Sequence, residues 1–128
     1  MAFNILIVDD SMTVRRTLAK VVGLCDLDVG DLLQAANGRE ALELLQGHWV
    51  DLVLSDLNMP EMNGVELIEQ MAADPMLQSV PVVVISTEGS RERIDQLVES
   101  GIRGFVRKPF TPEQVREVII ETLGVADS

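Results

Sequence analysis

The sequence predicts an α/β protein whose five parallel strands form a single doubly wound sheet with five helices on its two faces. Two observations support this fold class. Short apolar runs alternate five times with segments whose apolar residues recur at helical spacing. A residue suited to capping a helix precedes each helical segment. Because alternating strands and helices form parallel sheets with right-handed crossovers, the strands should all end at the same edge.

The first strand and helix are the clearest elements of the N-terminal part. Residues 4–8 are an apolar run that stops at two acids, which predicts a buried strand. Residues 12–24 follow Ser11, a suitable N-cap, and carry apolar side chains at helical spacing. Residues 26–30 are expected to form a loop, and residues 32–36 a weaker strand at an edge of the sheet.

The middle of the chain contains the apolar run that is central to the prediction, and it lies between two predicted helices. Asn37 and the Glu three residues later resemble a capping box, which opens a helix that Gly47 ends. Residues 50–54 are apolar apart from Asp51, and the run ends at Ser55 and the acid Asp56, which is typical of a strand buried in a parallel sheet. Asn63 repeats the cap pattern and predicts a helix over 64–73.

The C-terminal part supplies the last two strand and helix units. Residues 82–85 are an apolar run, and Ser90 can cap a helix that stops at Gly101. Residues 104–107 predict a short strand. The helix over 112–123 follows a threonine cap, with Pro at its first position and Gln three residues after the cap.

Composition limits the classes of protein that the sequence can encode. At 128 residues the chain is expected to form one domain over 1–128, with a core large enough to need no disulfide or structural metal. A net charge of −11 disfavours binding to nucleic acid or to anionic membranes. The single cysteine, the absence of a basic leader and the lack of a long apolar run favour a cytoplasmic location, without membrane insertion.

Polar side chains follow four of the five predicted strands. They are Asp9, Asp10, Asp56, Ser86 and Lys108. Since parallel strands end at one edge, these groups should be neighbours despite their distance in sequence. Two or three carboxylates form an oxygen-only site that suits Mg²⁺, to which a loop carbonyl such as that of Asn58 could add a ligand. A nearby ammonium and hydroxyl suit a phosphoryl group, and Asp56 could be a nucleophile that forms an acyl phosphate.

A larger set of residues forms a specific joint pattern: Asp9, Asp10, Asp56, Asn58, Met59, Pro60, Gly64, Ser86, Phe105, Lys108 and Pro109. This pattern resembles the receiver domain of two-component response regulators, over residues 4–123. The chain is most similar to the stand-alone chemotaxis regulators of that family. The resemblance implies a flavodoxin-like fold with strand order 2-1-3-4-5, a monomer, and a role in two-component signalling.

The resemblance also assigns the acidic residues. Asp56 would accept a phosphoryl group from a phosphohistidine of a CheA-like sensor histidine kinase. Asp10, Asp56 and the carbonyl of Asn58 would hold Mg²⁺, with Asp9 assisting through water. Such a protein signals and is not an enzyme that turns over a separate substrate.

The resemblance further implies a switch. Lys108 and Ser86 would bind the phosphoryl oxygens, and the Ser86 hydroxyl would move together with Phe105. A downstream protein would then bind the face made by the fourth helix, fifth strand and fifth helix. Asn58 and Glu88 would tune how fast the acyl phosphate hydrolyses. Phe105 stands where many relatives have Tyr, so any role of a phenolic hydroxyl is lost.

Two other functions remain as alternatives. An aspartyl-phosphate phosphatase typically carries a second Asp two residues after the nucleophile, but this chain has Asn58 there. A phosphorylation-independent adaptor usually lacks the acceptor or the lysine, and both are present. A zinc site at His48 is disfavoured because the chain has no second His and a single Cys. Its neighbour Trp49 is expected to be a partly buried anchor.

Overall fold

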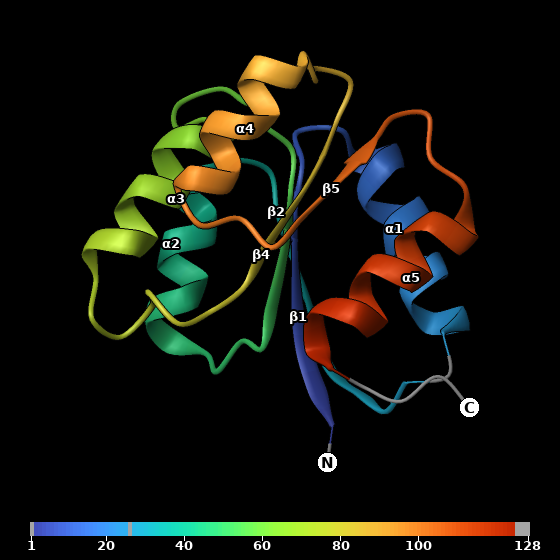
Figure 1. The fold of residues 1–128 in the computed structure, drawn as a ribbon. Helices are drawn as coiled ribbons and strands as arrows, with labels where there is room; N and C mark the ends of the chain where they lie inside the picture. The colour runs from blue at the N-terminus through green and yellow to red at the C-terminus, as the bar shows by residue number, and fades with distance from the viewer. Residues whose placement is uncertain (1, 26, 125–128) are drawn as a thin grey trace.

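Five parallel strands lie in one sheet in the order β2-β1-β3-β4-β5 in the computed structural model, which describes residues 2–25 and 27–124 (Figure 1). The strands are β1 (Phe3–Val8), β2 (Val29–Ala35), β3 (Leu52–Ser55), β4 (Val82–Ser86) and β5 (Gly104–Arg107). The helices are α1 (Met12–Leu24), α2 (Gly38–Gly47), α3 (Gly64–Ala73), α4 (Arg91–Glu99) and α5 (Pro112–Leu123). The predicted fold class and strand order are confirmed.

The helices cover both faces of the sheet. Figure 1 shows α1 and α5 on one side and α2, α3 and α4 on the other. The strands alternate accordingly: Ile5 and Ile7 of β1 belong to the core under α1 and α5, whereas Leu6 and Val8 pack in the core under the other three helices. This period of two follows from the pleat of a strand, and it buries β1 and β3 on both faces.

Side-chain caps explain why the helix starts are well predicted. All five N-cap side chains accept a backbone N–H from the first turn: Ser11, Asn37, Asn63, Ser90 and Thr111. The capping boxes of α3 and α5 are reciprocal. That of α2 is not, because the Glu40 carboxylate accepts the N–H of Ala36 instead of that of the cap.

The predicted extent of the second strand is wrong. β2 begins at Val29, three residues before the expected start, so residues 29 and 30 of the expected loop belong to the strand; Asp26 lies outside the described residues. Phe3 pairs with Val29 and Ile5 with Leu32, so β2 contains an extra residue, as in a β-bulge. A Cβ at Gly30 would lie 2.4 Å from Oδ1 of Asn4. The two strands can approach this closely because residue 30 is glycine.

No helix among the described residues has the length and apolar character needed to span a membrane.

Candidate functional site

Backbone hydrogen bonds bring the strand ends to one edge of the sheet. The N–H of Asp56 donates to the carbonyl of Val8 at 2.9 Å, and the N–H of Lys108 donates to the carbonyl of Ser86 at 2.9 Å. Val8 pairs with Ser55 across the β1–β3 ladder. Residues up to 99 positions apart in sequence are thereby neighbours, as the parallel topology predicts.

Three carboxylates meet at this edge. Asp9, Asp10 and Asp56 each offer an oxygen, and these oxygens lie within 4.8 Å of one another. Asp9 and Asp56 are buried, whereas Asp10 is exposed. The carboxylate of Asp9 accepts the N–H of Ser11 at 2.9 Å, and that of Asp56 accepts the N–H of Leu57 at 2.7 Å. Asp10, which faces solvent, is therefore the least engaged of the three carboxylates in hydrogen bonds to the protein.

Lys108 lies against two of these acids. Its Nζ donates to Oδ2 of Asp9 at 2.7 Å and to Oδ2 of Asp56 at 3.1 Å. Burial by itself would lower the pKa of Lys108, but the hydrogen bonds and charges of the two acids outweigh it and raise the pKa above 10.5. Lys108 is therefore a permanent positive charge at neutral pH.

The predicted switch residues Ser86 and Phe105 both lie next to the β4–α4 loop. Ser86 is completely buried, and its Oγ accepts the N–H of Glu88 at 3.2 Å. Glu88 is half-buried, and its carboxylate lies 3.7 Å from Nε of Arg93. Phe105 is half-buried in β5, and its ring would lie 3.1 Å from a Cβ built on Gly89. Ser86 and Phe105 are therefore linked through one short loop.

The β3–α3 loop carries the exposed Asn58, two residues after the candidate acceptor Asp56. Gly64 closes this loop by donating its N–H to the carbonyl of Leu57 at 2.8 Å. A Cβ at Gly64 would lie 2.2 Å from the carbonyl oxygen of Asp56. Only glycine fits so close to the backbone, which is a physical reason for glycine eight residues after Asp56.

Sequence reasoning missed two arginines that hold the loops around the site. Nη1 of Arg15 donates to the carbonyl of Asp9 at 2.7 Å, and its Nε donates to the side chain of Gln34 at 3.2 Å. Arg107 donates to the carbonyl of Gly89 and so ties β5 to the β4–α4 loop. The sequence offered no signal for either contact beyond a basic residue, within a helix for Arg15 and at a strand end for Arg107.

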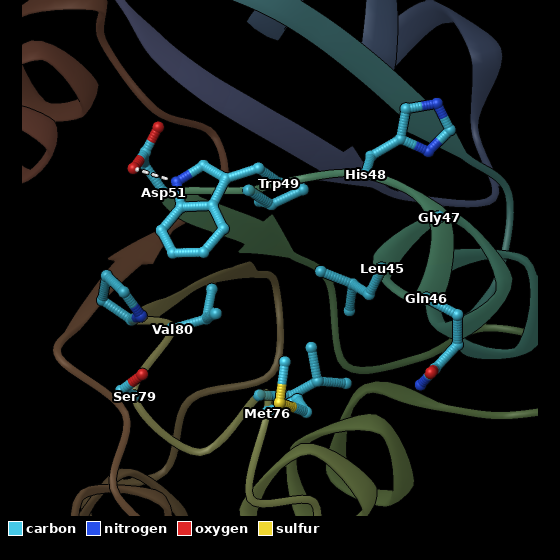
Figure 2. A pocket seen from close by; sticks show the side chains of 12 residues that line it. Leu45, Gln46, Gly47, His48, Trp49, Asp51, Met76, Ser79 and Val80 are labelled. Atoms are coloured by element: carbon cyan, nitrogen blue, oxygen red, sulfur yellow. Dashed lines mark hydrogen bonds between the residues drawn. The ribbon is translucent and has the colours of Figure 1, made fainter.

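A cavity of about 390 Å³ lies away from the acidic cluster (Figure 2). It is lined by the segments that precede β3 and β4, and so it lies at the opposite ends of the strands from the acids. Trp49 borders it with 78% of its surface exposed. The expectation of a partly buried anchor is therefore wrong. The Trp49 ring lies at the surface, where its indole N–H donates to the carboxylate of Asp51 at 3.0 Å.

The acidic cluster fits a divalent cation. Three carboxylates face one ammonium, so two negative charges remain uncompensated. Oxygen ligands that leave part of the coordination sphere to water suit Mg²⁺. Asp10 offers carboxylate oxygens that face solvent, whereas Asp9 and Asp56 each share one oxygen with Lys108 and the other with a backbone N–H.

Comparison with known proteins agrees with this geometry. A family model described as the response regulator receiver domain matches residues 5–120. A chemotaxis protein CheY homolog of Campylobacter jejuni is 36% identical over 122 residues, which cover 94% of this chain and 92% of that protein. Chemotaxis protein CheY-3 of Vibrio cholerae is 38% identical over 114 residues, covering 89% and 86%.

Solved structures show the same fold. Chemotaxis response regulator CheY4 of Vibrio cholerae has a TM-score of 0.85 at 30% identity, covering 95% of this chain and 99% of that one. A CheX–CheY–BeF3–Mg²⁺ complex from Borrelia burgdorferi has a TM-score of 0.85 at 26% identity, covering 93% and 87%. The chain belongs to the response regulator receiver domain family. Within this family it is a CheY-like receiver, consistent with two-component and chemotaxis signalling.

Proposed function

We propose that this receiver accepts a phosphoryl group on Asp56 from the phosphohistidine of a CheA-like sensor histidine kinase. The observation that carries the proposal is the position of Lys108, whose Nζ lies within 3.1 Å of both Asp9 and Asp56 beside a third carboxylate. A fixed ammonium next to a carboxylate nucleophile is what phosphoryl transfer requires, because the transferred group carries negative oxygens. We propose the receiver domain, with its core over 4–123, as the unit that does this.

In the proposed transfer, a carboxylate oxygen of Asp56 forms a bond to phosphorus while the P–N bond to the donor imidazole breaks. The imidazole nitrogen keeps the electron pair of the broken bond. The raised pKa of Lys108 keeps its ammonium protonated, so it can stabilise a phosphoryl oxygen throughout. The buried hydroxyl of Ser86, at the end of the adjacent strand, is the proposed neutral donor to another oxygen.

Mg²⁺ is the proposed cofactor, held by Asp10, Asp56 and the carbonyl of Asn58, with Asp9 assisting through water. When bound, it would supply positive charge for the phosphoryl oxygens. The Mg²⁺ named with the Borrelia burgdorferi CheY complex supports the choice of metal.

The proposed output is a change in the face made by α4, β5 and α5, which binds a downstream protein. The contact of Gly89 with Phe105 and Arg107 supports this route, because a movement of Ser86 must act on the same loop. Asn58 and Glu88 flank the site and are proposed to tune hydrolysis of the acyl phosphate. We further propose that the protein acts as a cytoplasmic monomer.

Acetyl phosphate with Mg²⁺ tests the acceptor directly. Intact mass should show one added phosphoryl group on the wild-type protein and none on Asp56→Asn. Asp95→Asn, which removes an exposed acid from α4, is the control of equal charge change and should be phosphorylated normally. Equal incorporation by Asp56→Asn would refute the assignment. Continuous release of phosphate from a generic ester would instead favour the phosphatase alternative.

A further inference from the structure

The β3–α3 loop contains a strained turn shortly after Asn58. The N–H of Met62 donates to the carbonyl of Pro60 at 2.7 Å, and Glu61 between them has a φ of 63°. A hydrogen bond that spans one residue of positive φ marks the rare, strained form of the γ-turn. Among residues 2–25 and 27–124, Glu61 is the one non-glycine residue with positive φ. Such a conformation persists where surrounding contacts hold it.

The N-terminus of α2 supplies those contacts. Nδ2 of Asn37 donates to Oε2 of Glu61 at 3.0 Å, and the N–H of Gly38 donates to the carbonyl of Met62 at 2.9 Å. Asn37 is only 5% exposed. A Cβ at Gly38 would lie 2.8 Å from Cγ of Met62, so the two segments approach as closely as glycine permits. The turn is thus clamped by side chain and backbone together.

Asn37 performs more than the capping that its position requires. Its Oδ1 accepts the N–H of Glu40 at 2.9 Å, and this is the whole of the N-cap function. Asp or Ser would serve equally well as a cap. Among the preferred N-cap residues, only asparagine adds an amide that donates two further hydrogen bonds. The bond to Glu61 uses that additional capacity.

We propose that Asn37 is a positioning residue of the phosphorylation site, which fixes the loop that carries Asn58 and so pre-forms the magnesium site. The base of the loop is fixed by the Gly64 N–H on the carbonyl of Leu57, and the clamp fixes its tip at Glu61 and Met62. Asn58 lies between these two fixed points. This inference rests on the proposed function, because the position of the Asn58 carbonyl matters only if a cation binds there.

Four variants separate the clamp from the cap. Asn37→Ser keeps a cap acceptor but loses the amide donor, and Asn37→Asp places a second carboxylate against Glu61. Glu61→Gly removes the acceptor and relieves the positive φ without touching the cap. The double variant Asn37→Asp with Glu61→Gln exchanges donor and acceptor, so it restores the hydrogen bond at the net charge of the wild type.

Mg²⁺ affinity, measured by calorimetric titration with the metal alone, is the first readout. The three single variants should bind Mg²⁺ about tenfold more weakly, at the lower end of what outer contacts of a metal site contribute. The double variant should recover to within about twofold of the wild type, which a merely structural role would not produce. Amide hydrogen exchange at residues 57–63 without metal should speed up in the single variants and recover in the double variant.

The outcomes separate the two proposals. A wild-type protein that fails to bind Mg²⁺ overturns the proposed function. Wild-type binding that Asn37→Ser and Glu61→Gly leave unchanged overturns the positioning role alone. A double variant as weak as the single ones also overturns it, because the hydrogen bond would then not be what matters.

Discussion

Removing the charge of Lys108 should make the stability of the folded protein depend strongly on a divalent cation. Lys108→Met keeps an apolar stem of similar length but removes the ammonium that lies 2.7 Å from Asp9 and 3.1 Å from Asp56. The side chains of these three residues are 15%, 2% and 11% exposed, so solvent screens the interaction little. The variant leaves three carboxylates facing one another with no cation.

The size of the effect follows from that burial. Breaking a buried ion pair by removing one partner costs about 3–5 kcal/mol, and the exposure of Asp10 to water puts this site at about 3 kcal/mol. A cation that binds only the folded state returns about 2.7 kcal/mol at a concentration of 100 times its Kd. Since a positive charge beside the cation is gone, Mg²⁺ affinity should also rise, by about tenfold or about 1.4 kcal/mol.

Urea denaturation followed by circular dichroism, in EDTA and in saturating Mg²⁺, measures the stability lost in the variant and the stability that Mg²⁺ returns. Fluorescence is a poor probe because Trp49 is already 78% exposed when the protein is folded. Lys20→Met, at an exposed position of α1, is the control and should stay within about 0.5 kcal/mol of the wild type. A Lys108→Met variant as stable as the wild type in EDTA would refute the reasoning. Equal stabilisation of both proteins by Mg²⁺ would refute it too.

Four further outcomes are expected. Gly64→Ala should lose more than about 2 kcal/mol in thermal denaturation, since its Cβ would meet the Asp56 carbonyl at 2.2 Å, whereas Gly47→Ala, with open space around it, should not. Ser86→Ala should still be phosphorylated on Asp56 but lose the accompanying change in hydrogen exchange over 87–107; an unchanged response would contradict the switch role. Trp49→Ala should cost less than about 1 kcal/mol in urea, and a core-sized loss would contradict its exposure. Because the pKa of Lys108 is raised, its contribution to stability should be constant from about pH 6 to 9 and lost only as the pH rises above about 10.5; a decline below pH 9 in the difference between wild type and Lys108→Met would contradict this.

The parts of the fold that sequence predicts well are those governed by local chemistry. α1, α3 and α5 begin where they were predicted to begin, because the side chains of Ser11, Asn63 and Thr111 accept a backbone N–H of the first turn and so fix the first helical residue. The start of β2 was predicted wrongly because residue 30 was assigned to a loop, whereas its close contact with Asn4 places it beside the neighbouring strand. Such a contact has no signature within either segment.

Some contacts of the candidate site could likewise be predicted from the sequence, and others could not. The meeting of Asp9, Asp56 and Lys108 could be foreseen because parallel topology places strand ends together. The bond between Asn37 and Glu61 could not be foreseen, because it joins two loop side chains 24 residues apart that belong to no periodic pattern. Loop-to-loop contacts are set by tertiary packing alone, and here they surround the site.

The charge balance of the site explains why a neutral hydroxyl belongs to the proposed switch. Three carboxylates and one ammonium leave two negative charges, which one divalent cation would neutralise. Phosphorylation of Asp56 would replace a carboxylate of charge −1 by a group of charge close to −2, so the balanced site would gain about one negative charge. Without the cation this excess would be about three charges, which predicts that phosphorylation requires Mg²⁺. With the cation, the remaining excess is small enough to be met by hydrogen-bond donors. Ser86, fully buried and already linked to the β4–α4 loop, is placed to be one of them, so in the proposed switch that residual charge would drive the surface change.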